Sequence, residues 1–153
     1  MAFINWDSHL SIGIPTMDQQ HKKMADIINQ FHLSVRTGAD VEKLSLLLTA
    51  LTQVTTAHLE EEEMLMEKAG FPHIDDHKHG HERIIEQLNI MQKKLDDGTK
   101  PSLTETAVFF KNWFVSHIQK DDRDLGVYLY STRNKLKNEA AHSDKVKKEE
   151  PVK

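Results

Sequence analysis

The stretch HLEEEEMLMEKAGFPHIDDHKHGH, residues 58–81, contains two helical patterns separated by a Gly-Phe-Pro turn. His58 and Glu62 stand four residues apart, and so do His77 and His81. Residues at this spacing lie next to each other on one face of a helix. The turn residues are typical of the end of one helix and the beginning of another. The stretch therefore predicts two neighbouring helices, each with a pair of polar side chains on one face.

Apolar residues recur at three- and four-residue steps on both sides of this stretch and predict four helices. The helices are expected at about residues 18–37, 40–70, 74–98 and in a fourth segment that begins after Pro101. Ser102 and Glu105 form a capping box at the start of the fourth helix. A weaker helical piece, interrupted by Gly126, follows it. Because the connections are short, the expected fold is all-α, an up-down-up-down antiparallel four-helix bundle.

The two ends of the chain lack this pattern. Residues 1–17 hold apolar side chains without helical spacing, and we expect them to form an extended arm across the bundle. From Asn134 onward aromatic residues are absent and lysines are frequent, which predicts a disordered charged tail after a short C-terminal helix. The expected organisation is one domain over residues 1–131 and a tail over residues 132–153.

The composition argues against several classes of function. The chain has 153 residues and a formal charge of −4, from 20 lysines and arginines against 24 aspartates and glutamates. This balance argues against nucleic-acid binding, and the absence of cysteine excludes disulfides and thiolate metal sites. The longest apolar stretch, Leu44 to Leu51, is too short to cross a membrane. Because the start of the chain does not resemble a secretory signal, we expect a cytoplasmic protein that does not insert into membranes.

The ten histidines require an explanation. Half of them share the core-facing stripes of the predicted helices with Glu62: His21, His58, His77, His81 and His117. A buried imidazole or carboxylate costs several kcal/mol unless it is paired or bound, so a cation among these side chains would satisfy them. Asp122 follows His117 by five residues, about 140° around an ideal helix, so we expect the fourth helix to end or bend near Asp122.

The other polar residues near this set are not expected to bind a metal. The histidines that fall off the stripes are His9, His32, His73, His79 and His142. Glu60, Glu61 and Glu63 are expected to form a solvated face. Only the helical register distinguishes Glu62 from them, because Glu61 could also reach the cluster.

The donor set favours some metal chemistries over others. Imidazole suits iron, copper and zinc, and five imidazoles with two carboxylates are too many for one ion. Ferritin-like di-iron bundles use a Glu-x-x-His motif, but none of the five stripe histidines has a glutamate three residues before it. A centre rich in histidine and poor in anions favours binding and releasing dioxygen over cleaving it. The donors alone do not exclude another metal.

These motifs together closely resemble the hemerythrin family, specifically the stand-alone bacteriohemerythrins, over about residues 6–131. The motifs are Asp18-Gln-Gln-His21, His58-x-x-x-Glu62, Phe71-Pro72 before His77-x-x-x-His81, and His117-x-x-x-x-Asp122. Trp6 and Gly13 match positions of the family's N-terminal arm.

The resemblance implies a non-haem di-iron centre with an oxo or hydroxo bridge derived from solvent. By motif position, His77, His81 and His117 would bind one iron, His21 and His58 the other, and Glu62 and Asp122 would bridge both. One coordination position would stay vacant on the two-histidine iron, where the family binds dioxygen as hydroperoxide. By the same resemblance, the dioxygen pocket would be lined by Met24, Leu59, Trp113, Phe114 and Ile118.

The expected function is reversible dioxygen binding by a monomer that carries or stores dioxygen, or delivers it to an enzyme that consumes it. This role is not enzymatic. Three alternatives remain open at this point. The chain could be a module that senses dioxygen, nitric oxide or redox state, a di-iron oxidase, peroxidase or nitric oxide reductase, or a protein for storing or sensing iron.

Overall fold

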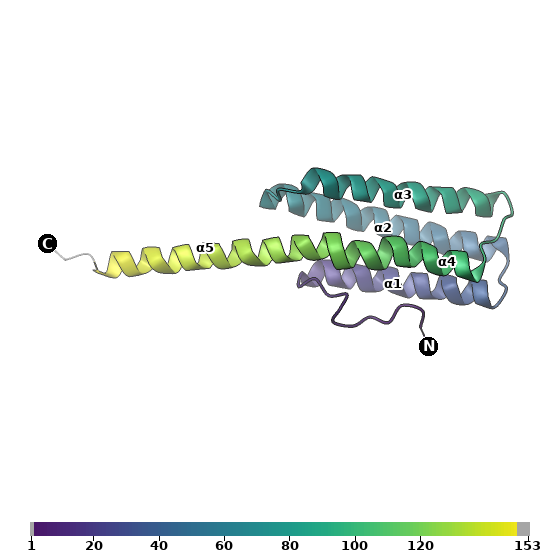
Figure 1. Ribbon diagram of the computed structural model, residues 1–153, viewed down its shortest axis with the longest axis horizontal. Coiled ribbons are helices and arrows are strands. Elements are labelled where there is room, and N and C mark those ends of the chain that lie inside the picture. Colours follow the sequence, from purple (N-terminus) through teal and green to yellow (C-terminus); the bar gives the residue numbers. More distant parts are fainter. Residues whose placement is uncertain (1, 150–153) are drawn as a thin grey trace.

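The computed structural model describes the backbone of residues 2–149 and the side chains of residues 2–141, and this part of the chain contains helices but no strand. The helices of the bundle are α1 (Pro15–Arg36), α2 (Val41–Ala69), α3 (Ile74–Asp96) and a fourth column that begins with α4 (Leu103–Phe110). As Figure 1 shows, α1 packs against α2 and α4, and α2 packs against α3. The predicted all-α four-helix bundle is confirmed.

The fourth column is one continuous helix with two wider segments. After α4 it passes through the π-helical segments η1 (Lys111–Val115) and η2 (Ile118–Asp122) into α5 (Arg123–Glu149). The residues at each junction keep right-handed helical backbone angles, so the column does not break. In a π-helix the backbone hydrogen bond spans five residues instead of four, which widens the turn.

The helix ends follow local sequence signals. The Asp40 side chain accepts a hydrogen bond from the Lys43 backbone N–H at 2.9 Å, and Ser102 accepts one from the Glu105 N–H at 3.1 Å. α1 begins at Pro15, earlier than the periodicity predicts, because proline is favoured in the first helical turn. The short connections between these ends place consecutive helices side by side.

The hydrophobic core fills one half of the bundle and leaves the other half to polar residues. Its fully buried side chains come from all four helical columns: Ile28, Phe31, Leu44, Leu48, Leu51, Leu88, Leu95 and Phe110. A smaller apolar cluster, formed by Met66, Phe71 and Leu125, lies toward the other end. In α2, α3 and the fourth column the stripe histidines occur between residues of these two clusters, and in α1 His21 lies between Met17 and Met24 of the main cluster. Apolar packing therefore closes both ends of the polar region.

The N-terminal arm lies along the bundle, as the sequence predicts (Figure 1). The Asn29 side chain accepts a hydrogen bond from the Ile4 N–H at 2.7 Å and donates one to the Ile4 carbonyl at 2.9 Å. Gly126 does not interrupt the helix but permits a close backbone contact, because a Cβ atom there would lie 2.2 Å from the Ile12 carbonyl oxygen. The arm therefore contacts both α1 and α5.

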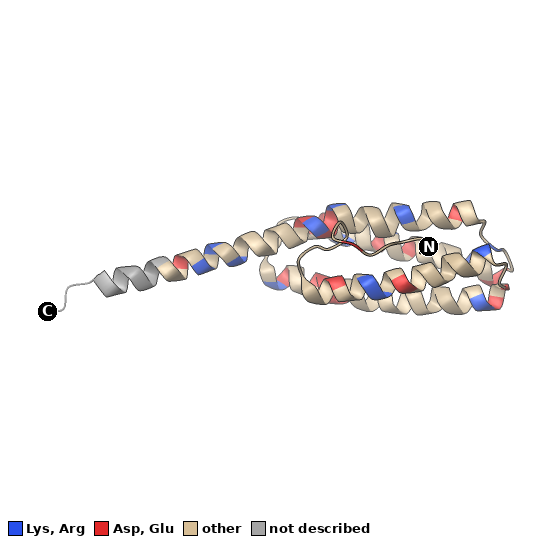
Figure 2. Cartoon of the chain, turned by 90° about the horizontal axis from the view of Figure 1, so that it is seen from below, with Lys and Arg blue, Asp and Glu red and all other residues tan. Residues whose placement is uncertain are grey.

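The end of the chain differs from the prediction of a disordered tail over residues 132–153. α5 continues as a helix to Glu149 and projects beyond the other helices (Figures 1 and 2). Residues 132–149 contain no glycine or proline and many lysine, glutamate and alanine residues, which favour helix even without an apolar face. The last four residues of the predicted tail lie outside the described part.

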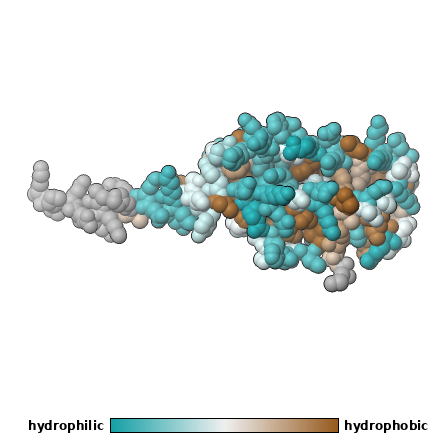
Figure 3. Space-filling model, viewed as in Figure 1, coloured by the Kyte–Doolittle hydropathy of each residue, from teal (hydrophilic) through white to brown (hydrophobic). Residues whose placement is uncertain are grey.

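The surface is mostly polar. Acidic and basic residues are interspersed along the bundle in Figure 2, and Figure 3 shows many hydrophilic residues on one face, with hydrophobic residues between them. Within residues 2–149, none of the helices is both long enough and apolar enough to span a bilayer.

Candidate metal centre

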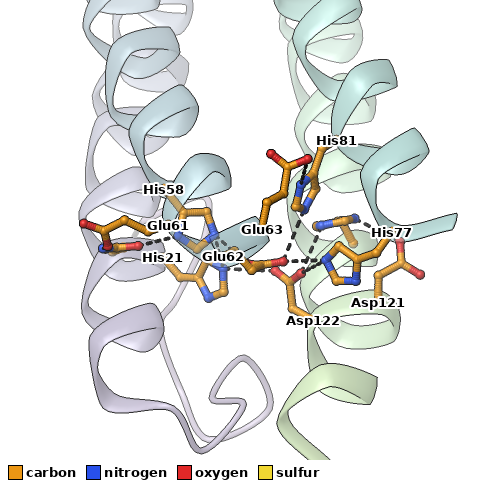
Figure 4. Close-up of polar contacts among 11 residues, drawn as sticks. His21, His58, Glu61, Glu62, Glu63, His77, His81, Asp121 and Asp122 are labelled. Atoms are coloured by element: carbon orange, nitrogen blue, oxygen red, sulfur yellow. Dashed lines mark hydrogen bonds and ion pairs between the residues drawn. The ribbon is translucent and has the colours of Figure 1, made fainter. Parts of the chain in front are cut away.

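All seven predicted donors meet in the polar half of the bundle (Figure 4). α1 supplies His21, α2 supplies His58 and Glu62, α3 supplies His77 and His81, and the fourth column supplies His117 and Asp122. Both carboxylate residues are completely buried, and the most exposed donor, the His117 side chain, is only 9% exposed. The fold thus brings together all seven side chains that the sequence places on core-facing stripes or directs back toward them, and their binding of a metal stays a prediction.

Asp122 reaches the cluster by a different route from the one expected. The fourth column does not end at Asp122, because η2 continues directly into α5. The five-residue hydrogen-bond pattern of η2 brings residues five apart to the same side, and Asp122 Oδ1 lies 3.0 Å from His117 Nε2. Of the two predicted alternatives, an end or a bend, the end is wrong, and the carboxylate does point back toward His117.

The two oxygens of Glu62 face different imidazoles. Oε1 contacts His77 Nε2 and lies 3.2 Å from His81 Nε2. Oε2 lies 3.0 Å from His58 Nε2. The carboxylate thus extends between the side of the cluster formed by α3 and the side formed by α2.

Asp122 repeats this arrangement. Its Oδ1 atom lies 3.0 Å from both His77 Nε2 and His117 Nε2, and its Oδ2 atom lies 3.0 Å from His21 Nε2. The cluster therefore has two parts that share both carboxylates. We call them the three-histidine group (His77, His81 and His117) and the two-histidine group (His21 and His58).

The donors fit a metal better than they fit one another. The contacts of His21 with Asp122, of His58 with Glu62 and of His117 with Asp122 are 3.0 Å long, but they do not have hydrogen-bond geometry. Glu62 Oε2, His117 Nε2 and both Asp122 oxygens are consequently buried without a hydrogen-bond partner. Leaving such atoms unpaired is costly, and imidazole nitrogens that converge with carboxylate oxygens suit transition-metal ions.

In the metal-free cluster, the buried imidazoles and carboxyl groups shift one another's pKa values. Burial lowers the pKa of His77 and of His117, but nearby carboxylates outweigh it. Asp122 and Glu62 raise the pKa of His77 to about 9, and Asp122, Asp121 and Glu62 raise that of His117 to about 10. Burial works in the opposite direction on the carboxyl groups, yet the surrounding imidazoles hold the pKa of both Glu62 and Asp122 below the ordinary range. The cluster thus favours ionised carboxylates, the form that binds a cation.

Two imidazoles are also held from outside the cluster. The His58 Nδ1–H donates to Gln20 Oε1 at 2.6 Å, and the Gln20 amide in turn donates to Glu61. The His117 Nδ1–H donates to Asp121 Oδ2 at 2.9 Å. Such outer hydrogen bonds select the tautomer that leaves Nε2 free to bind a metal.

The sequence analysis missed these outer partners. Asp121 stands four residues after His117, and this spacing was a usable signal. Gln20 contacts His58 across the α1–α2 interface, and no spacing rule connects two helices in this way. Glu61 is exposed, as expected of a solvated face, but it also holds the Gln20 side chain.

Among the residues whose side chains the structure describes, the histidines that the sequence places off the stripes lie outside both groups. His9 and His79 are exposed and pair with Asp7 and Glu82. His32 stacks on Phe3. His73 is exposed in the connection before α3, and the side chain of His142 lies outside the described residues.

The five residues expected to line a dioxygen pocket are all buried. Met24, Trp113, Phe114 and Ile118 belong to the main core cluster. The Phe114 ring lies 6.4 Å from the His21 ring, centre to centre, on the side of the two-histidine group. Leu59 instead lines a groove between α2 and α3. Their contact with a bound molecule stays a prediction.

A four-helix bundle that gathers five imidazoles and two carboxylates around shared buried oxygens defines a metal-binding bundle protein. Residues 12–129 match the family described as "Hemerythrin HHE cation binding domain". The chain therefore belongs to the hemerythrin family, whose domain carries a non-haem metal centre.

Relatives and solved structures agree with this assignment. A bacteriohemerythrin of Methylococcus capsulatus is 30% identical over 84% of this chain and 98% of its own length. One of Stenotrophomonas maltophilia is 30% identical over 80% of this chain and 79% of its own length. A crystal structure described as wild-type hemerythrin covers 84% of this chain and 98% of the solved chain, with 29% identity and a TM-score of 0.76.

Proposed function

We propose that the chain binds dioxygen reversibly at a centre of two iron ions, acting as a monomeric carrier, store or delivery protein in the cytoplasm. The observation that carries the proposal is the pair of donor groups that share Glu62 and Asp122. An enzyme that consumes dioxygen is the expected recipient. The proposed role is binding, not catalysis.

In this proposal His77, His81 and His117 would hold one iron, and His21 and His58 would hold the other. Glu62 and Asp122 would serve both ions, which is supported by the way each carboxylate directs one oxygen toward each group. The two-histidine group offers one imidazole fewer, so a coordination position would stay open for dioxygen there. When bound, the iron pair would supply the electrons for reversible dioxygen binding.

The side chains around the donors would keep water away from the metal ions. The helices bury the donors almost completely, and Phe114 places an apolar ring beside the His21 ring. Met24, Trp113 and Ile118 belong to the same apolar cluster as Phe114 and would complete an apolar side of the centre. A dry surrounding slows irreversible oxidation, because charged products and water are poorly accommodated there.

Sensing is the second candidate function. Asp122 and the projecting α5 belong to one continuous helix, so a change in how Asp122 is bound would act directly on that helix. A sensing role requires two arrangements of α5 that depend on the ligand. Hydrogen exchange along α5, compared with and without dioxygen, would detect them.

The deciding experiment measures iron per chain and the visible spectrum while reduced protein is cycled between argon and air. Two irons and a colour that appears in air and disappears under argon are expected. Two irons that turn ferric once and stay so would favour redox sensing or an oxidase. Little iron, or zinc in its place, would overturn the proposal.

Leu59→Ala tests whether the fifth predicted pocket residue also protects the centre. Removing this buried side chain should speed autoxidation several-fold, because the groove between α2 and α3, which also reaches His81, then admits water more easily. Leu46→Ala on the same helix is the control, since Leu46 is 72% exposed. Oxidation is followed by the visible spectrum, and equal rates in the two variants would show that Leu59 serves only the packing.

A further inference from the structure

A groove of about 650 Å³ lies between α2 and α3 and is not part of the metal centre. Its rim carries four carboxylates, Glu60, Glu63, Glu82 and Glu86, against a single lysine, Lys93. We call it the acidic groove. Such a concentration of one charge sign in a hollow raises the local concentration of cations.

The acidic groove reaches His81, one of the proposed ligands. The His81 Nε2 atom faces the cluster, while its Nδ1 atom is buried and has no hydrogen-bond partner. The nearest carboxylate is that of Glu63, whose Oε1 atom lies 3.8 Å from Nδ1 (Figure 4). Glu63 is 29% exposed, so it connects the groove with the buried imidazole.

His81 differs from the other imidazoles that lie at grooves. Gln20 holds the outer nitrogen of His58, and Asp121 holds that of His117. No hydrogen bond holds the outer nitrogen of His81. Its ring can therefore turn without breaking an outer contact.

The other two grooves that reach ligand imidazoles have no excess of negative charge. The groove at His117 includes Arg83 and Lys120 beside Asp121, so its basic side chains outnumber its acidic one. The groove at His58 places Lys23 opposite Glu61. Among the grooves described at ligand imidazoles, the acidic groove is the one with an excess of negative charge.

We infer that the acidic groove is the site through which a divalent metal ion is loaded into the buried centre. This inference rests on the proposed di-iron function for the identity of the metal. Glu63 first replaces part of the hydration shell of a ferrous ion with carboxylate oxygens. The unanchored His81 then turns toward the ion and transfers it to Glu62, whose Oε1 atom is 3.2 Å from His81 Nε2.

The test follows anaerobic uptake of ferrous ion by metal-free protein in a stopped-flow instrument. Glu63→Gln should slow uptake on the order of tenfold, because it removes the carboxylate next to His81. The final iron content and spectrum should match the unsubstituted chain. Glu42→Gln, an exposed acid in the first turn of α2, is the control and should load at the ordinary rate.

Raising the salt concentration should slow the unsubstituted chain more than Glu63→Gln, because screening weakens the attraction that the variant has partly lost. Equal uptake rates for Glu63→Gln and the unsubstituted chain would overturn the inference. A lower final iron content or an altered spectrum would also overturn it, because Glu63 would then position His81 in the finished centre.

Cobalt(II) separates this inference from the proposed function. Slower uptake of cobalt(II) by Glu63→Gln supports the groove even if the loaded iron protein does not bind dioxygen. Slower uptake with an unchanged final content is the expected result for both metals. Cobalt(II) that enters both proteins at one rate contradicts the groove irrespective of what the iron centre does.

Discussion

The two donor groups share two carboxylates but differ in number of imidazoles and in surroundings. The three-histidine group comes from α3 and the fourth column, and the outer nitrogen of His117 is held by a surface acid, Asp121. The two-histidine group comes from α1 and α2 and lies near the arm, with the Trp6 ring 6.4 Å from the His21 ring. The comparison teaches that the two groups differ mainly in the number of imidazoles, because each has an aromatic ring packed against it, Phe71 at His77 and Phe114 at His21.

Removing a shared carboxylate should cause both groups to lose their iron, so that they no longer differ. We expect Asp122→Ala to lose almost all iron and to destabilise the chain by about 3–5 kcal/mol, because buried imidazoles lose their charged partner. Iron per chain and urea unfolding measure the two effects. Asp124→Ala, at an exposed position of α5, is the control. If Asp122→Ala kept two irons, Asp122 would not bridge.

Replacing one histidine in each group tests whether the two groups retain iron differently. His21→Ala leaves a single imidazole in its group, so we expect iron to fall from two ions to about one and the response to dioxygen to disappear. His117→Ala leaves two imidazoles and both carboxylates, the donor set that the other group has, and should retain more iron. Metal analysis measures the iron that each variant retains. Equal losses would show that the extra imidazole of the three-histidine group does not help to retain iron.

In the metal-free chain, pH should act on the three-histidine group. The raised pKa values of His77 and His117 stabilise the fold fully below the ordinary imidazole pKa, and this stabilisation is lost as pH rises through about 9 and about 10. We expect the free energy of unfolding to fall by several kcal/mol between neutral pH and pH 10.

Urea unfolding across this pH range checks the expectation. The iron-loaded chain is the control and should show a flatter profile, because metal-bound imidazoles are already unprotonated at Nε2. A flat profile in the metal-free chain would mean that its imidazoles are not held in the charged form.

A matched pair of glycine substitutions gives the smallest expected effect. Gly126→Ala forces the arm away from α5 and should cost about 1–3 kcal/mol. Gly80→Ala, beside His117, meets its nearest neighbour at 3.6 Å, an ordinary contact, and should be neutral or slightly stabilising. Urea unfolding compares them, and an equal loss in both would show that the arm contact is not the cause.

The sequence predicted best what depends on local periodicity. His58 with Glu62 and His77 with His81 could be placed on the inner faces of their helices because a four-residue step is regular in any α-helix. The same regularity misled the prediction near Asp122. An ideal α-helix turns Asp122 away from His117, whereas the π-helical segment η2 brings it to the same side. A π-helical segment leaves no periodic signature that an α-helical template can detect.

Contacts between segments far apart in the chain could not be predicted from the sequence either. Gly126 was interpreted as an interruption, because the Ile12 carbonyl that requires it belongs to the other end of the chain. The Gln20 contact with His58 escaped for the same reason. Helical propensity, in contrast, was underestimated over residues 132–149, where the absence of an apolar stripe was interpreted as disorder.

The π-helical segment that aims Asp122 also has a consequence for chain length. Adding or removing one residue in a helix rotates everything after it by about 100° around the axis. A one-residue deletion between His117 and Asp122 would convert the wide turn to an α-helical one, which covers about the same rotation, so Gly126 would stay opposite the Ile12 carbonyl. An added residue has no such compensation and would rotate Gly126 away. The phase of one helix thus ties the metal donor to the contact with the arm, and this segment should tolerate the loss of one residue better than the gain of one.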